Sequence, residues 1–119
     1  MESIIWFDKT IKLDSNNAQP YSEKGCVLKT LERYEDAIEL HDKALELDDD
    51  YSLAYYYKGD CMKSLNNFTE AIKLFDKAIV LEPKEVLFYV NKGNSLNLIE
   101  DGNWGKSKEA ILCFEKANQ

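Results

Sequence analysis

Several residue types recur along this chain at one constant interval. Glycines recur at Gly25, Gly59 and Gly93, whose numbers differ by 34 and again by 34. Three further sets keep this interval: Tyr21, Tyr55 and Tyr89; Lys24, Lys58 and Lys92; and Leu31, Leu65 and Ile99. A fixed period of this length is the signature of repeat architectures, whose stacked units bury a continuous core. We therefore expect a row of similar units.

A second register follows the first and then departs from it. It comprises Ile4, Ile38, Ile72 and Ile111, and Asp8, Asp42, Asp76 and Glu115. The intervals are 34, 34 and then 39, so five residues are inserted between Ile99 and Ala110. The polar segment 100–105 holds two of the five glycines, which is typical of a loop. We expect its Trp104 to fold back onto the last helix; the alternative is that it stands exposed as an anchor for a partner.

Each unit has the periodicity of two helices. The clearest stripe consists of Phe68, Ala71, Ile72, Phe75, Ala78 and Ile79. The spacing is that of a helix and not of a strand. The predicted helices span 2–14, 18–31, 34–47, 52–65, 68–82, 86–99 and 106–117. We expect Asn67 to cap the fifth helix with Glu70 in a capping box, and Pro83 to end it. Asp50 or Ser52 is expected to cap the fourth.

Composition narrows the class of protein. Only 5 glycines and 2 prolines occur among 119 residues, which disfavours an all-β fold. The net charge of −7 disfavours binding to nucleic acid. No apolar run approaches the ~20 residues of a membrane span, and the start has no basic region of a signal peptide. With three cysteines and no C-x-x-C pair, we expect reduced thiols and a cytoplasmic location.

The pattern resembles the tetratricopeptide repeat (TPR) family. Its aromatic, glycine, alanine and proline positions read here as Tyr55, Gly59, Ala71, Phe75, Ala78 and Pro83. The resemblance implies an all-α, right-handed superhelical solenoid of antiparallel helix pairs with a concave face. The predicted division is a single domain over 1–119. It comprises a half repeat at 1–17 and repeats at 18–51, 52–85 and 86–119, the last with the insertion.

Candidate catalytic and metal-binding residues have simpler interpretations. His41 stands where the sister units carry Phe75 and Phe114, so it is expected to be a packing residue. Cys26, Cys61 and Cys113 are too far apart for a usual zinc site and are expected to be buried. The run Asp48-Asp49-Asp50 lacks the pattern of a calcium loop. We therefore expect no enzymatic activity, no cofactor and no metal.

A protein-binding surface remains. The resemblance implies that the first helix of each repeat lines the concave face. Helical phasing then selects the side of each first helix that faces away from its partner helix. The predicted binding residues are Glu23, Cys26, Leu53, Tyr56, Tyr57, Asp60, Lys63, Val90, Asn91 and Asn94. Tyr56 and Tyr57 are the strongest candidates, because tyrosine is enriched at binding hot spots and neither lies on the packing stripe within the unit. An idle surface tyrosine is the alternative.

One binding mode of the family can be examined directly. Repeats that hold acidic chaperone tails use a clamp of cationic and amide side chains. The matching positions here are Ser22, Cys26, Tyr57, Leu87 and Asn91, and only Asn91 suits an anion. A neutral or basic peptide is therefore the expected partner. The alternative function is that of a structural segment of a longer array, with weak homodimers formed through its open ends.

Overall fold

The computed structural model describes residues 2–99 and 108–117, which form seven α-helices and no strand. They are α1 (Glu2–Leu13), α2 (Ala18–Thr30), α3 (Tyr34–Leu47), α4 (Ser52–Ser64), α5 (Phe68–Leu81), α6 (Val86–Ile99) and α7 (Lys108–Ala117). The predicted boundaries agree to within one residue for the first six helices. The predicted loop at 100–105, with Trp104, lies outside the described residues.

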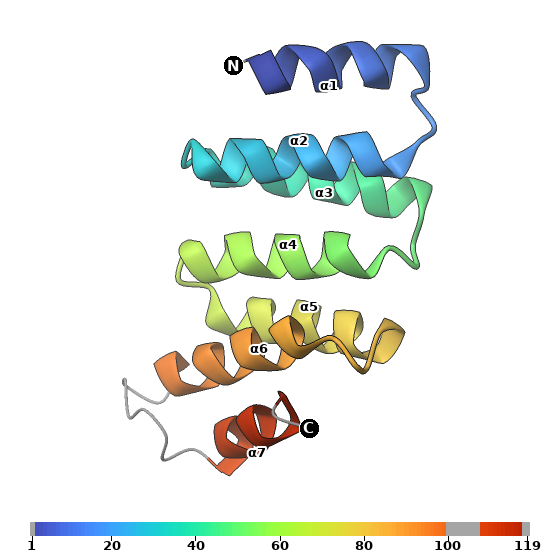
Figure 1. Ribbon diagram of the computed structural model, residues 1–119. Coiled ribbons are helices and arrows are strands. Elements are labelled where there is room, and N and C mark those ends of the chain that lie inside the picture. Colours follow the sequence, from blue (N-terminus) through green and yellow to red (C-terminus); the bar gives the residue numbers. More distant parts are fainter. Residues whose placement is uncertain (1, 100–107, 118–119) are drawn as a thin grey trace.

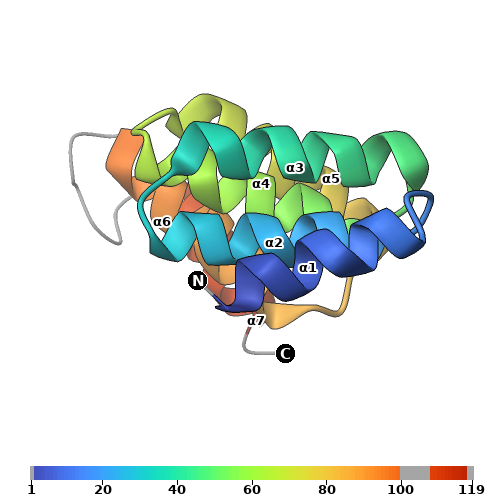
Figure 2. The ribbon, with the colours of Figure 1, turned by 90° about the horizontal axis from the view of Figure 1, so that it is seen from above.

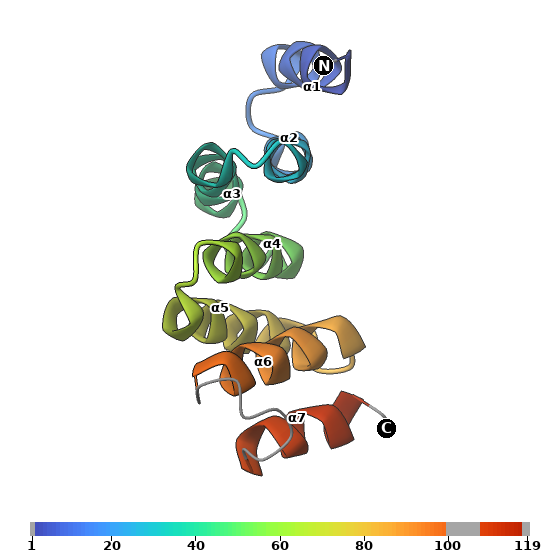
Figure 3. The ribbon, with the colours of Figure 1, turned by 90° about the vertical axis from the view of Figure 1, so that its left-hand side faces the viewer.

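The helices are stacked in chain order, with the N-terminal and C-terminal helices at opposite ends (Figure 1). The stack is elongated, 48 × 26 × 20 Å, and each helix contacts the next along the chain. Seen nearly along the helices, the chain zigzags as it descends the stack (Figure 3). The helices α2, α4 and α6 also contact one another, whereas in the described residues α3 and α5 do not meet. This places α2, α4 and α6 in an inner row, and the fold is an all-α solenoid.

Within each antiparallel pair, a glycine of the first helix meets a ring of the second. A Cβ atom added at Gly59 would lie 2.7 Å from Phe75 Cε1, and one at Gly25 would lie 2.8 Å from His41 Cε1. Real Cβ atoms essentially never make contacts this short, so any larger residue at these positions would force the ring or the helix to shift. The alanines on the second helices of the first two pairs are completely buried: Ala37, Ala44, Ala71 and Ala78. The predicted close crossing is confirmed, and we call the pairs α2–α3, α4–α5 and α6–α7 units.

The turns inside the first two units share one geometry. Glu32 and Asn66, which are one period apart, have positive φ angles of 60° and 64°. Arg33 N–H donates to Leu28 O at 2.9 Å, and Asn67 N–H donates to Met62 O at 2.8 Å. This is the Schellman arrangement, in which a left-handed residue ends the helix.

The predicted helix caps are wrong. Asn67 precedes α5, but its side chain accepts no hydrogen bond from that helix. Its conformation is instead set by the end of α4, since its backbone N–H closes the Schellman turn. Tyr51 occupies the cap position of α4 without a side-chain bond, and the Ser52 hydroxyl donates to Glu82 Oε1 at 2.8 Å. Pro83 follows the end of α5 by two residues, as expected.

A ladder of ion pairs joins successive helices of different units. Each pair links a lysine of a first helix to an aspartate of the preceding second helix. The pairs are Lys24–Asp8 at 2.6 Å, Lys58–Asp42 at 2.7 Å and Lys92–Asp76 at 2.7 Å. Figure 2 looks down the stack from α1, where this ladder begins. The two registers of the sequence are therefore joined in space.

Among the described residues, no helix is both long and apolar enough to cross a membrane.

Candidate functional site

The predicted binding residues all lie on the three inner helices. Glu23 and Cys26 are on α2, the five central residues are on α4, and Val90, Asn91 and Asn94 are on α6. Leu53 is exposed and the other nine are half-buried. The inner row therefore presents them on neighbouring helices. We call the surface of α2, α4 and α6 that carries them the inner face.

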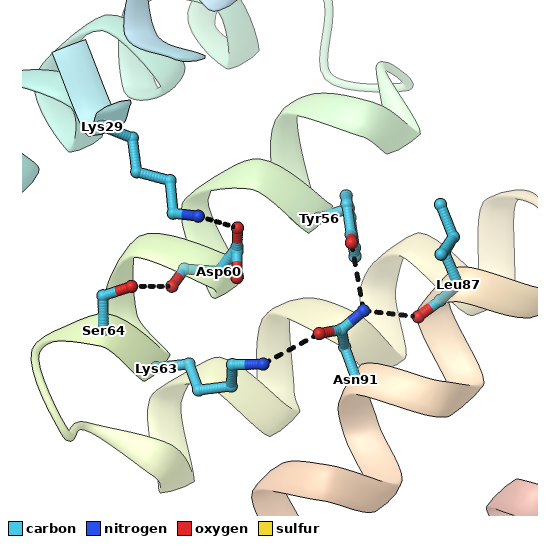
Figure 4. A network of polar contacts seen from close by, with 7 residues as sticks. All are labelled: Lys29, Tyr56, Asp60, Lys63, Ser64, Leu87 and Asn91. Carbon is cyan, nitrogen blue, oxygen red and sulfur yellow. Dashed lines mark hydrogen bonds and ion pairs between the residues drawn. The ribbon is translucent and has the colours of Figure 1, made fainter. Parts of the chain in front are cut away.

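Polar side chains connect the three helices across the inner face (Figure 4). Lys29 Nζ lies 2.7 Å from Asp60 Oδ2 and so joins α2 to α4. Lys63 Nζ donates to Asn91 Oδ1 at 2.9 Å and joins α4 to α6. The hydrogen bond to Asp60 is the largest cause of a raised pKa of Lys29. Lys29 and Lys63 are thus both engaged within the molecule.

Asn91 uses its whole amide group in this network. Its Nδ2 donates to Tyr56 Oη at 3.0 Å and to Leu87 O at 2.9 Å, while Oδ1 accepts from Lys63. An amide has two N–H donors, so both are committed. Asn91 therefore has no free donor for an anion, although it was the one clamp position predicted to suit one.

Tyr56 is a packing residue as much as a surface residue. Its ring centroid lies 5.0 Å from that of Phe88 and 5.7 Å from that of Phe75, both completely buried. Burial is also the main cause that raises the pKa of Tyr56 to about 12. The expectation that Tyr56 lies off the packing stripe of its unit is wrong, because its ring meets Phe75 of the same unit as well as Phe88 of the next.

A different environment surrounds Tyr57. Its ring lies 5.7 Å from His41 and 5.4 Å from Tyr56. Burial raises the pKa of Tyr57, and Cys26 and the Glu23 carboxylate raise it further. The same carboxylate adds to the effect of burial in raising the pKa of Tyr51. The Glu23 carboxylate is therefore within electrostatic range of both tyrosine hydroxyl groups, near the start of α4.

Ser22 and His41 form a buried pair. Ser22 Oγ lies 2.9 Å from His41 Nδ1, and neither residue has any exposed surface. Ser22 was expected at a clamp position on the concave face, and that expectation is wrong because its side chain is buried. Burial lowers the pKa of His41 to about 4, so the ring is neutral. A serine beside a histidine suggests a nucleophile and base, but no substrate can reach this pair, which confirms the packing role of His41.

Apolar surface on the inner face comes from two equivalent leucines. Leu53 and Leu87 stand one period apart, near the starts of α4 and α6, and are 37% and 53% exposed. Val90 is half-buried one turn further along α6. The inner face thus offers an apolar strip beside the polar network.

The cysteines have the character of small apolar residues. Cys61 and Cys113 are buried as expected, whereas Cys26 is half-buried on the inner face. Burial is the main cause that raises the pKa of Cys26 to about 11 and that of Cys61 to about 12. Both thiols are therefore protonated and weakly nucleophilic at neutral pH. Within 2–99 and 108–117, no group of three or more His, Cys, Asp or Glu side chains could hold a metal ion.

Sequence reasoning missed the roles of three residues. Ser22 is buried against His41, Lys29 joins α2 to α4 through Asp60, and Tyr51 lies near the Glu23 carboxylate. Lys29 and Asp60 occupy different positions of their repeats, so no repeat interval joins them. The ion-pair ladder could have been predicted from the sequence, because its lysines and its aspartates both recur every 34 residues.

Comparisons with known proteins agree with this architecture. A tetratricopeptide repeat model matches residues 30–87. A crystal structure of MamA shares the fold at a TM-score of 0.83 and 25% identity, covering 97% of this chain and 64% of that one. The chain thus spans less than two thirds of the length of MamA. No curated protein matches the sequence.

Two structures with peptide-binding titles are also similar. YrrB, described as a TPR protein with an unusual peptide-binding site, has a TM-score of 0.82 at 26% identity, covering 93% of this chain and 55% of that one. The second TPR of Spaghetti (RPAP3), bound to the HSP90 peptide SRMEEVD, has a TM-score of 0.77 at 20% identity, covering 86% and 90%. The constant repeat period, the glycine–ring contacts, the family match and the shared fold together show that this chain belongs to the tetratricopeptide repeat family.

Proposed function

We propose that the inner face binds a peptide segment of another protein. The observation that carries this proposal is the pair of exposed leucines, Leu53 and Leu87, repeated on neighbouring inner helices beside hydrogen-bonding groups. Apolar area with a polar rim is the usual composition of an interface. The peptide-binding titles of YrrB and RPAP3 support a protein-interaction module of this kind.

We also infer that the partner is neutral or basic. The chain carries a net charge of −7. Of the five clamp positions, Ser22 is buried and Asn91 has both N–H groups committed. The peptide in the RPAP3 structure, SRMEEVD, contains three acidic residues, and the described part of the inner face offers no matching set of free cations. Within the described residues none of the three cysteines forms a disulfide, which is consistent with the expected cytoplasmic location.

The experiment is selection of a peptide from an unbiased display library on the full chain, followed by calorimetry. Changing both leucines, Leu53→Ser with Leu87→Ser, is expected to weaken binding at least about tenfold, because less apolar area is then buried against the peptide. Leu13→Ser is the matched control, because Leu13 is 89% exposed on α1. An unchanged dissociation constant for the double variant would place the site elsewhere.

The second candidate function is self-association through the ends of the stack. Two large apolar side chains of α1, Ile5 and Trp6, are 57% and 60% exposed, and Leu112 of α7 is 63% exposed. We propose a weak, closed dimer, since a net charge of −7 opposes open-ended growth. Sedimentation from low micromolar to near-millimolar protein should show a rising mass. A constant monomer mass would rule the dimer out.

A further inference from the structure

Among the described residues of the inner face, one charged side chain, that of Glu23 on α2, lacks the hydrogen bond or ion pair that Lys29, Asp60 and Lys63 have. Lys29 pairs with Asp60, and Lys63 is held by the Asn91 amide. Glu23, half-buried on α2, forms no hydrogen bond or ion pair with any described residue. The equivalent positions in the later units are Tyr57 and Asn91, so the carboxylate is a departure from the repeat. An external cation binds more favourably to such a carboxylate than to one already paired within the molecule.

Two tyrosines of the neighbouring unit lie on the same side of α2 as this carboxylate, since Tyr57 and Ser22, the residue next to Glu23, both contact His41. Tyr51 packs on the core formed by α2, α3 and α4, and Tyr57 contacts His41. Both hydroxyl groups feel the charge of Glu23, which contributes to their raised pKa values. A planar guanidinium can stack on a tyrosine ring while it forms two hydrogen bonds with one carboxylate.

An open hollow of about 640 Å³ lies beside the corner formed by Glu23, Tyr51 and Tyr57, between the turns that precede α2 and α4. Its walls include Gln19, Tyr51, Leu53 and Asp48. Gln19 lies four residues before Glu23 on α2, and Leu53 lies four residues before Tyr57 on α4. Residues four apart share a helix face, so Glu23 and Tyr57 each lie one turn along their helix from a wall of the hollow, and Tyr51 belongs to both the hollow and the corner. The hollow has room for the aliphatic stem of a long side chain.

We propose that this corner, formed by Glu23, Tyr51 and Tyr57, binds an arginine side chain of the partner peptide. The stem of the arginine lies in the hollow against Leu53, and its guanidinium pairs with Glu23 between the tyrosine rings. The acidic turn Asp48-Asp49-Asp50 adjoins the hollow and attracts cations toward it. The inference rests on the proposed function and adds the chemistry of one contact.

The test is an NMR titration of the isotope-labelled full chain with the probe acetyl-Gly-Arg-Gly-amide. Amide shifts are expected at Glu23, Tyr51 and Tyr57. Acetyl-Gly-citrulline-Gly-amide has the same shape without the charge, and it should bind at least about tenfold more weakly. Glu23→Gln should weaken the arginine probe by a similar factor, while Glu39→Gln, exposed on α3, should leave it unchanged.

Other outcomes would overturn the site. Equal binding of the citrulline probe, or of the arginine probe to Glu23→Gln, would remove the role of the charge. Tighter binding of a lysine probe than of the arginine probe would overturn the assignment to arginine. The failure of the proposed function is distinguishable. A library peptide that depends on Leu53 and Leu87 but not on Glu23 would leave the function in place and overturn only this corner.

Discussion

Gly93 and Phe114 meet as closely as Gly59 and Phe75, although five more residues separate them along the chain. A Cβ atom at Gly93 would lie 2.7 Å from Phe114 Cε1, the distance found at Gly59. The residue numbers differ by 21 in the first pair and by 16 in the second. The longer connection has therefore not changed how α6 and α7 cross. The glycine–ring contact, rather than the length of the connection, positions the two helices.

The first prediction concerns this contact. Gly59→Ala would stabilise an isolated helix by about 1 kcal/mol, since alanine is the better helix former. Here we expect a net loss of about 1–3 kcal/mol in the free energy of unfolding, because the added methyl meets the Phe75 ring. Urea unfolding measures it. Lys73→Ala, exposed on α5, is the control. A gain in stability at Gly59 would contradict the close crossing.

A second prediction follows from the buried imidazole. Burial lowers the pKa of His41 from its ordinary value of 6.5 to about 4, against the raising effect of Asp42 and Asp60. The unfolded chain thus binds a proton more readily than the folded chain. The contribution of the neutral imidazole to the free energy of unfolding is fully present above pH 6.5. It is lost as the pH falls toward 4, by roughly 3 kcal/mol in total.

His41→Phe isolates that contribution. The variant carries the aromatic residue of the sister units and has no proton to bind at this position. Urea unfolding of both chains should show the wild-type chain losing stability relative to His41→Phe as the pH falls below 6.5, since all carboxylates are common to both. Parallel curves of stability against pH down to pH 4.5 would show that His41 is not the responsible group.

The third prediction separates the two adjacent tyrosines of α4. Tyr56→Ala should cost about 2–3 kcal/mol of stability, because it leaves a cavity against Phe75 and Phe88. Tyr56→Phe should cost about 1 kcal/mol, since the Asn91 amide loses an acceptor. Tyr57→Ala, which lies away from both phenylalanines, should cost less than Tyr56→Ala. Thermal unfolding measures all three. If Tyr56→Ala unfolds at the wild-type temperature, the ring does not support the core.

The fourth prediction tests the ladder. Lys58→Glu places a like charge opposite Asp42 and should destabilise the chain by about 1 kcal/mol. Adding Asp42→Lys restores the attraction with the charges exchanged and should recover most of that loss. Both effects should shrink at high salt. Exchanging the exposed pair Arg33 and Asp36 serves as the control, with little change expected. Strictly additive single effects at Lys58 and Asp42 would mean that the pair is not coupled.

A fifth prediction uses the left-handed turn residues. Glu32, with φ at 60°, adopts a conformation that suits glycine, so Glu32→Gly should stabilise the chain by about 0.5–1 kcal/mol. Asn66→Gly should gain less, because asparagine tolerates this conformation well. Chemical denaturation of both variants checks the order. Destabilisation by Glu32→Gly would indicate that its side chain has an unassigned role.

Features that repeat were predictable from the sequence. The crossing glycines, the buried alanines and the helix boundaries each occur at a fixed spacing and arise from local packing that every unit shares. The particular contacts of the inner face were not predictable in the same way. Ser22 is buried because its hydroxyl meets His41, which stands in this unit where the sister units carry phenylalanine. Asp60 reaches Lys29 across the joint between two units, at positions that no repeat interval links. The failed cap at Asn67 has a similar cause, since the end of α4 sets its backbone.

The ladder also has a consequence for how such a chain can change its length. Lys58 and Lys92 make the same joint with the preceding unit, at 2.7 Å in each case. Excision of residues 52–85 would bring Asp42 into the register of Asp76 and so opposite Lys92. Duplication of the same segment would create one more copy of an existing joint. Gain or loss of a whole period by recombination therefore keeps the charge complementarity of the ladder, and the reach of the array is a property that evolution can adjust in single steps.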